Sequence, residues 1–273
     1  MYGKGESLVC DDVMESLRLQ VEKVDSLSCL MMTHSMQGAG GGLTSRLLYE
    51  MKSTYSKTLK WNFCLTPPSN DLKAEIVFGN ALTFNRMLHH CDLTTCLDNM
   101  ALDKLCSAKR NGLGIKQPTF INYNALAARI FSSCTSGLRI GLGTYVSASE
   151  GRRSLSPQGL CTNLVCYPRI HFTVPGYAPL MGEAMADFAT ESGKQIAKNS
   201  LTRGLLSSVN LDNGKLMSTA VLARNITHGE VIESVNTRSR EPDCQYVDWC
   251  PSRYVVGSHS DLSTTDCVCL YNS

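Results

Sequence analysis

A glycine-rich run at residues 38–42, Gly-Ala-Gly-Gly-Gly, constrains the fold of this chain more than any other sequence feature. It follows residues 28–33, an apolar run with the length of a buried strand. It precedes residues 44–55, whose apolar side chains recur at helical spacing and whose predicted cap is Thr44. A strand, a glycine loop and a helix in this order are typical of a parallel sheet covered by helices.

The same alternation continues on both sides of this segment. Two further segments have helical periodicity and two have the length of short strands: 12–25 and 80–90, then 61–65 and 94–97. Asp98 and Asn99 then open another helix, and an Ala- and Leu-rich helix is predicted at 123–138. We therefore predict an α/β fold whose first domain, residues 1–150, is a partial nucleotide-binding domain that ends in this bridging helix.

After residue 150 the pattern changes. Residues 142–159 are rich in glycine and serine and are predicted to form a loop. Thr227 and Glu230 form a predicted capping box for one helix. Strands are predicted at four places: 167–174, 216–222, 246–249 and 267–270. Residues 151–273 are therefore predicted to form a smaller, mixed α+β domain.

Charge and cysteine content exclude several classes of protein. The net charge is +2 with no run of like charges, which gives no bias toward nucleic acid or membrane surfaces. The thirteen cysteines lie mostly among apolar neighbours, which is typical of reduced thiols packed in a core. No apolar stretch approaches about 18 residues, and no cysteine pair has a partner pair at zinc spacing. We predict a cytoplasmic protein without a metal site.

The glycine run also carries the clearest chemistry. Backbone N–H groups at a helix N-terminus, together with the helix dipole, favour a phosphate. The run is not followed by Gly-Lys-Ser/Thr, and it does not match the dinucleotide fingerprint. The alternative is a tight packing turn with no ligand.

Four segments then resemble the tubulin superfamily, in the family's order and with nearly its spacing. Thr33-His34-Ser35 before the glycines is similar to the tubulin Thr-His-Ser and its GGGTGSG loop. Residues 96–102 are similar to C-I-D-N-E-A-L, residues 162–172 to T-N-L-V-P-Y-P-R-I-H-F, and residues 175–180 to P-G-F-A-P-L. The resemblance covers almost the whole chain. It implies a tubulin-like α/β fold, GTP as the bound nucleotide, and assembly with other tubulin subunits.

The resemblance implies a phosphate site that is only partly kept. Gly38 and Gly41 match glycines of the family loop, whereas Gly40 stands at its phosphate-binding threonine and Gly42 at its serine. Leu43 stands at the closing glycine. Two hydroxyl donors are therefore replaced, and backbone N–H groups remain as the candidate phosphate ligands.

The resemblance places the guanine end of the site on two asparagines. Asn99 matches the base-reading asparagine, and Asn80 lies one residue from the second one. Asp103 stands at the position we assign to a base-stacking aromatic. The acid that activates water in the family falls on Gly159, so we expect no catalytic residue and at most a weak GTPase that acts only in an assembly.

The resemblance begins after the family's third phosphate loop and stops before its C-terminal helices. We therefore expect a fragment of a longer product, with Mg²⁺ bound only when the earlier part is present. We expect a divergent class, zeta-like ahead of epsilon or delta, with microtubule, centriolar, basal-body or ciliary partners. The alternative is a nucleotide-free interaction or capping module that binds tubulin surfaces.

Overall fold

The computed structural model describes residues 9–67, 73–108, 112–140, 144–147, 151–180, 191–202, 214–240, 246–250, 253–260 and 265–272. The chain forms two compact units, each of which we describe by itself. The first unit comprises Met1–Cys96 and Tyr167–Phe172, and the second comprises Leu97–Cys166 and Thr173–Ser273. The expected domain boundary near residue 150 stays a prediction.

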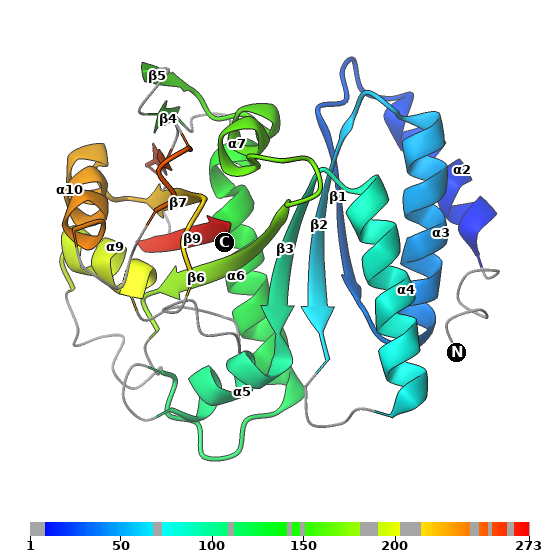
Figure 1. Ribbon diagram of the computed structural model, residues 1–273, viewed down its shortest axis with the longest axis horizontal. Helices are drawn as coiled ribbons and strands as arrows, with labels where there is room; N and C mark the ends of the chain where they lie inside the picture. Colours follow the sequence, from blue (N-terminus) through cyan, green and yellow to red (C-terminus); the bar gives the residue numbers. More distant parts are fainter. Residues whose placement is uncertain are drawn as a thin grey trace. The chain divides into compact units, whose positions relative to one another are not determined.

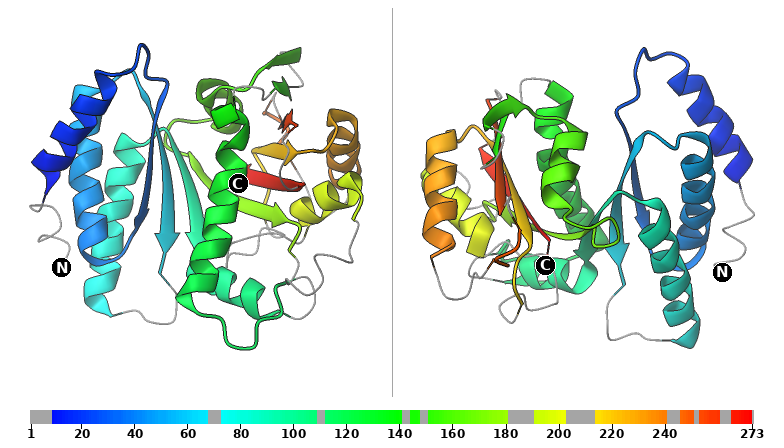
Figure 2. Two further views of the ribbon diagram at one scale, coloured as in Figure 1. Left: turned by 180° about the vertical axis from the view of Figure 1, so that it is seen from behind. Right: turned by 45° about the horizontal axis from the view of Figure 1, so that its top comes forward.

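The first unit contains the parallel sheet that the sequence predicts. Strand β1 (Cys29–Ser35) pairs in parallel with β2 (Leu59–Thr66), and β3 (Leu93–Asp98) follows β2 in the sheet. Helices α3 (Gly38–Thr54) and α4 (Ala74–His90) lie on one face of these strands, and α2 (Cys10–Val21) packs outside α3 (Figures 1 and 2). The predicted segments 12–25, 28–33, 61–65, 80–90 and 94–97 are confirmed as elements, with shifted ends.

An apolar core and one buried lysine hold this unit together. The core cluster joins α3, α4 and β2 through Met36, Leu48, Met51, Cys64, Met87 and Cys91. Lys60 on β2 is 1% exposed, and its ammonium group donates to the carbonyl oxygens of Tyr55 and Thr58, just after α3 ends. The carboxyl end of a helix favours a cation, which explains how this charge is buried.

The second unit contains a mixed sheet of strand order β6-β9-β7-β8-β4-β5. Strand β9 runs antiparallel to β6 and to β7, whereas β7 and β8 are parallel. Its strands are β4 (Thr144–Ser147), β5 (Gly151–Ser154), β6 (Phe172–Ala178), β7 (Ser218–Arg224), β8 (Tyr254–His259) and β9 (Asp266–Asn272). Its helices are α5 (Asn99–Ser107), α6 (Phe120–Ile140), α7 (Pro157–Leu164), α9 (Gly193–Thr202) and α10 (His228–Arg238).

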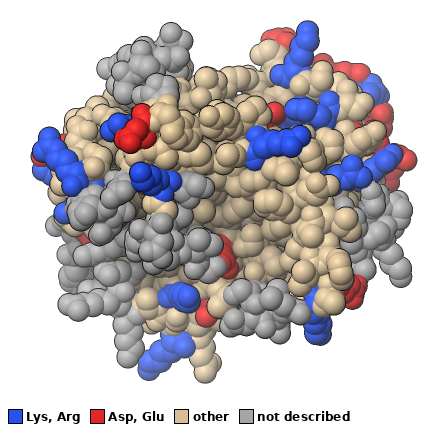
Figure 3. Space-filling view, viewed as in Figure 1, with Lys and Arg blue, Asp and Glu red and all other residues tan. Residues whose placement is uncertain are grey.

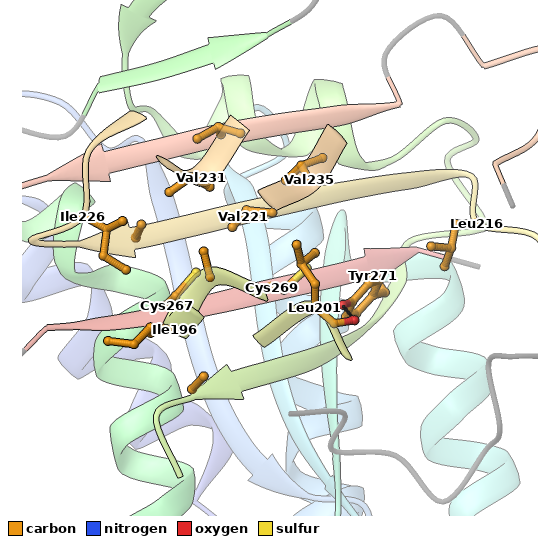
Figure 4. Packing of buried hydrophobic residues seen from close by; sticks show 14 residues of the cluster. Ile196, Leu201, Leu216, Val221, Ile226, Val231, Val235, Cys267, Cys269 and Tyr271 are labelled. Carbon is orange, nitrogen blue, oxygen red and sulfur yellow. Dashed lines mark hydrogen bonds between the residues drawn. The ribbon is translucent and has the colours of Figure 1, made fainter. Parts of the chain in front are cut away.

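Helices α9 and α10 close the core of the second unit. In Figure 4, Ile196 and Leu201 of α9 and Val231 and Val235 of α10 point toward the strands β7 and β9. The Tyr271 hydroxyl of β9 donates to the Leu201 carbonyl oxygen at 2.7 Å. The predicted capping box starts α10: Thr227 Oγ1 accepts from the Glu230 N–H, and the Glu230 carboxylate accepts from the Thr227 N–H.

A cluster of polar side chains is buried within the second unit. Asp266 on β9 is 3% exposed, and its carboxylate lies 3.4 Å from Nε of Arg224 on β7. The Ser133 hydroxyl of α6 donates to the same carboxylate at 2.9 Å, and the Tyr177 hydroxyl of β6 lies at 3.5 Å from it. The cluster therefore joins α6 to three neighbouring strands.

Several predictions for the second unit are wrong in detail. The predicted loop 142–159 contains strands β4 and β5 and the start of α7, because β4 is held by antiparallel pairing with β8, far along the chain. The predicted strand 167–174 begins only at Phe172. The predicted strand 246–249 is a single bridge from Tyr246 to Leu216. Helix α9 and strand β8 were not predicted.

Candidate functional site

The glycine run lies inside a helix rather than in a loop before it. Strand β1 ends at Ser35 and α3 begins at Gly38, whose φ of 66° is in the left-handed region that favours glycine. Gln37 is the N-cap residue, and Thr44 is buried in the body of the helix. The prediction that Thr44 caps this helix is therefore wrong. Met36, Gln37 and the first glycine of the run, Gly38, make the whole turn between strand and helix.

The N-terminus of α3 offers backbone donors to an anion. The helix is 17 residues long, and its first turn carries no acidic side chain. Within the described part of the chain, the Gln37 side chain makes no capping hydrogen bond to this turn. Ala39 and Gly40 are exposed. The first four N–H groups of a helix have no partner inside it, and the helix dipole adds positive potential there. The arrangement suits a phosphate oxygen.

Gly40 and Gly41 serve different purposes. A Cβ at Gly40 would lie 3.5 Å from the Ser35 carbonyl oxygen, which is an ordinary contact. A Cβ at Gly41 would lie 2.4 Å from the Met36 carbonyl oxygen and 2.5 Å from Oγ1 of Thr83. Gly41 is therefore required for the close approach of α3 to Met36 and α4, whereas packing leaves Gly40 free to change.

Two polar residues, Asn62 and His34, lie behind this turn, and the sequence argument missed Asn62. Asn62 on β2 is 1% exposed, and its amide nitrogen lies 2.9 Å from Nε2 of His34 on β1. Nδ1 of His34 lies 3.0 Å from the Ser35 carbonyl oxygen. Burial lowers the pKa of His34, so its ring is neutral, with Nδ1 donating and Nε2 accepting. An asparagine within an apolar strand was the available signal.

Asn80 is the second site residue in the first unit. It lies in α4 and is half-buried, and its Oδ1 is buried with no hydrogen-bond partner among the described residues. A Cβ placed on the preceding residue, Gly79, would meet nothing within 4 Å. A buried amide oxygen without a partner among these residues is suited to accept a hydrogen bond from a ligand.

Asn99 belongs to the second unit. It is the first residue of α5, whose cap is Asp98, because Asp98 Oδ1 accepts from the Met100 N–H at 2.8 Å. Asp103, one turn further on, accepts from the Tyr123 hydroxyl at 2.6 Å, and this bond raises the pKa of Tyr123 to about 12. The glycine run and Asn80 lie in the first unit, and Asn99 lies in the second.

Gly159 takes part in the start of α7. Its N–H donates to the Ser156 hydroxyl at 3.1 Å, and its carbonyl oxygen accepts from the Asn163 side chain at 2.8 Å. Pro157 follows the cap as the first helical residue, a position that favours proline. The position therefore provides backbone contacts and no carboxylate.

Surface charge, helix length and the placement of metal-binding side chains bear on the kinds of partner that the described residues can bind. In Figure 3, basic and acidic side chains are mixed over α2 and α3, where ion pairs such as Arg18–Glu15 and Arg46–Glu50 form. None of the helices in the described ranges is both long and apolar enough to span a membrane. Among the same residues, no three His, Cys, Asp or Glu side chains come together as a metal site.

Two family models match the chain. Residues 2–107 match the Tubulin/FtsZ family, GTPase domain, and residues 168–265 match the Tubulin C-terminal domain. The chain belongs to the tubulin superfamily. Its α/β fold is a tubulin GTPase domain followed by a tubulin C-terminal domain, as the sequence predicts. The glycine run, Asn80 and Asn99 all fall within the segment that matches the GTPase domain.

Three curated relatives of this tubulin-superfamily chain are named as tubulin alpha chains. It is 33% identical to the tubulin alpha-3 chain of Saccharomyces cerevisiae over 261 residues, 94% of this chain and 56% of the relative. It is 31% identical to the tubulin alpha-1 chain of the same yeast, over 97% of this chain and 60% of the relative. It is 32% identical to the tubulin alpha-4 chain of Drosophila melanogaster, over 94% and 54%. The chain spans a little more than half the length of these relatives.

Proposed function

We propose that this tubulin-superfamily chain is a guanine-nucleotide-binding subunit of a cytoskeletal polymer. The observation that carries the proposal is the N-terminus of α3, which follows a parallel strand, begins with Gly38 and exposes Gly40. This arrangement lies in the segment that matches a GTPase domain. Backbone N–H groups and the helix dipole would hold a phosphate there.

Each site residue has a role in this proposal. The N–H groups at Gly38, Gly40 and Gly41 are the candidate phosphate donors, with Gly41 also needed for packing. Gly42, also expected to contact the phosphate, is the buried fifth residue of α3, so its N–H lies beyond the four groups that have no partner inside the helix. The Asn80 amide oxygen and the Asn99 side chain are the candidate contacts to the base and its sugar. GTP, when bound, supplies the terminal phosphate whose hydrolysis changes how subunits hold together. The first turn of α3 carries no carboxylate, so it offers Mg²⁺ no ligand of the kind this cation prefers.

The partners in this proposal are other tubulin subunits, and the location is the cytoplasmic cytoskeleton. Hydrolysis would occur only in an assembly, since Gly159 supplies no acid. We keep the zeta-like class, with epsilon and delta behind it, as the class prediction and the centriole or basal body as its site. The relatives named above favour an alpha-related subunit of microtubules as the competing assignment.

A second candidate function is a nucleotide-free module that binds or caps tubulin surfaces. Three observations favour it. Gly40 and Gly42 provide no hydroxyl donors, Gly41 has a packing reason to be glycine, and Asp103 is engaged by Tyr123 rather than left to face a ligand. In this case the glycine run would be a close contact between helices and nothing more.

A matched pair of substitutions at Gly40 separates the two functions. Gly40→Asp places a carboxylate in the first turn of α3, where it stabilises the helix by about 0.3–1 kcal/mol and repels a phosphate. Gly40→Ala adds a methyl group without charge at the same place. Nucleotide would be extracted from the purified chain and both variants and identified by chromatography, with titration by labelled GTP as a second measurement.

The guanine-nucleotide proposal expects bound GTP or GDP in the parent chain and in Gly40→Ala, and its loss in Gly40→Asp. Circular dichroism and thermal unfolding would show that Gly40→Asp is folded at least as well as the parent. Equal nucleotide content in the two variants would refute a phosphate at this helix. Absence of nucleotide from all three, with no binding of added GTP, would favour the nucleotide-free module.

A further inference from the structure

Two cysteines of the second unit meet across a long stretch of sequence. The Sγ atoms of Cys166 and Cys250 lie 3.3 Å apart, although the residues are 84 positions apart in the chain. Cys166 is half-buried and Cys250 is buried, and neither is in a disulfide. From this geometry we propose that Cys166 and Cys250 form a reversible disulfide when the protein meets a peroxide.

The fold brings these two cysteines together through fixed neighbours. The end of α7, just before Cys166, is tied to the sheet: the Asn272 side chain donates to the Leu164 carbonyl oxygen at 2.8 Å, and the Ser218 hydroxyl donates to the Asn163 carbonyl oxygen at 2.7 Å. The segment 246–250 is tied to the same sheet, because the Val247 N–H donates to the Leu216 carbonyl oxygen at 2.9 Å. The short distance between the thiols therefore follows from the tertiary structure.

The local backbone also allows the sulfur atoms to move closer. A disulfide needs the sulfurs about 2.05 Å apart, so the pair must close by roughly 1.3 Å. Cys166 lies in a bend after the end of α7, and Cys250 follows a turn at residues 248–249, so neither is inside a helix or strand. Rotation about the side-chain bonds and a small backbone shift can supply this movement without breaking a ladder of hydrogen bonds.

A second thiol pair provides an internal comparison. Sγ of Cys64 and Sγ of Cys96 lie 3.4 Å apart, on the neighbouring strands β2 and β3 of the first unit. Cys64 is 0% exposed and belongs to the apolar core cluster. A peroxide has no access to the Cys64 sulfur, and although Cys96 is half-buried, strands β2 and β3 hold both backbones in place. We therefore expect this pair to remain reduced under conditions that oxidise Cys166 and Cys250.

The chemistry balances with hydrogen peroxide as the oxidant. The Cys166 thiolate attacks one peroxide oxygen, the O–O bond breaks, and a sulfenic acid and hydroxide result. The Cys250 sulfur then attacks the Cys166 sulfur, the S–O bond breaks, and the proton of Cys250 leaves with the hydroxyl group as water. Two thiols lose two hydrogen atoms in all, and one peroxide becomes two molecules of water. A dithiol reductant reverses the reaction by thiol–disulfide exchange.

The rate of this reaction depends on pH in a defined direction. Burial, followed by the contact with the Cys250 thiol, raises the pKa of Cys166 to about 12. Only the thiolate attacks, so the pair is slow to oxidise at neutral pH. The initial rate of oxidation should rise about tenfold for each pH unit between roughly 7 and 10, because the thiolate fraction rises tenfold per unit while the pH is far below the pKa.

The test treats the native chain with hydrogen peroxide, alkylates the remaining thiols, and maps peptides by mass spectrometry without reduction. The expected product is a linked pair of peptides that contains Cys166 and Cys250, lost on treatment with dithiothreitol. Cys166→Ser and Cys250→Ser should each abolish it, whereas Cys64→Ser should leave its yield unchanged. Cys250→Ala serves as a second variant, because a hydroxyl group buried at this position can disturb folding.

The proposal fails if both cysteines stay open to alkylation after oxidation of the folded chain. It also fails if Cys250 is blocked to the same extent in Cys166→Ser, since its partner would then be another thiol. Oxidation that appears only after the chain is unfolded in urea counts against the proposal as well. Unfolding of the oxidised chain at a higher urea concentration than the reduced chain would support a link that closes a long loop.

Discussion

Replacing Gly41 by alanine tests whether this glycine is required by packing. A Cβ at this position would lie 2.4 Å from the Met36 carbonyl oxygen and 2.5 Å from Oγ1 of Thr83, and real Cβ contacts essentially never fall under 3.0 Å. Neither neighbour can move freely. The Met36 N–H donates to the Leu65 carbonyl oxygen, and the Thr83 hydroxyl donates to the Gly79 carbonyl oxygen at 3.0 Å.

The expected loss in the free energy of unfolding for Gly41→Ala follows from a comparison with Gly40→Ala. Both substitutions gain about 1 kcal/mol from the higher helix propensity of alanine. Only Gly41→Ala overpacks the core, which costs about 1–3 kcal/mol. The gain is common to both variants, so the difference between their free energies of unfolding isolates this steric cost. With two contacts under 3.0 Å, we expect the upper part of that range.

Urea unfolding in a Trp249→Phe background measures this difference in the first unit. Trp61, 1% exposed on β2, is then the remaining tryptophan of the two in the chain and reports on this unit. Gly41→Ala should unfold about 1 M earlier in urea than Gly40→Ala, with the same slope. Equal midpoints would refute the argument that Gly41 is held by packing, and would make a ligand the better reason for a glycine there.

Two further predictions concern buried polar groups. Asp266→Ala should lower the free energy of unfolding by about 3–5 kcal/mol, because it removes a buried carboxylate that lies 3.4 Å from Nε of the buried Arg224. Glu233→Ala, which breaks the exposed pair with Lys194, should cost about 0–1 kcal/mol. Equal losses of stability in thermal unfolding would contradict this expectation. Burial lowers the pKa of His34, so the unfolded chain binds its proton first, and stability should fall as pH drops through about 6.5. Urea midpoints from pH 7.5 to 5.5 should show this fall, and His34→Gln should make it shallower.

Much of the first unit was predictable because its elements are decided by local pattern. Strand β1 and helix α3 were found from an apolar run and a helical periodicity, and the order of strands and helices implied a parallel sheet. In the second unit, the α10 capping box was likewise found from Thr227 and Glu230 alone, because both partners of a cap lie within four residues. The exact start of α3 was not predicted, because a single glycine with a left-handed φ, Gly38, is enough to make the turn before the helix.

The second unit was harder to predict because distant pairing decides it. Strand β4 is held by β8, more than 100 residues away, and its own residues show no alternation that marks a strand. Strand β7 was predicted at 216–222 as a short apolar run, although all of its side chains are buried and the usual two-residue period is absent. Such strands look like any short apolar run in sequence.

The sequence by itself determined the superfamily and the positions of the glycine run, Asn80 and Asn99, because ordered motifs survive as short stretches of residues. Only the tertiary structure showed that Gly41 packs against Met36 and Thr83 while Gly40 stays open, and that Cys166 meets Cys250. The physical reason is that close packing and thiol contact depend on atoms brought together from distant segments. No local pattern of residues encodes those distances.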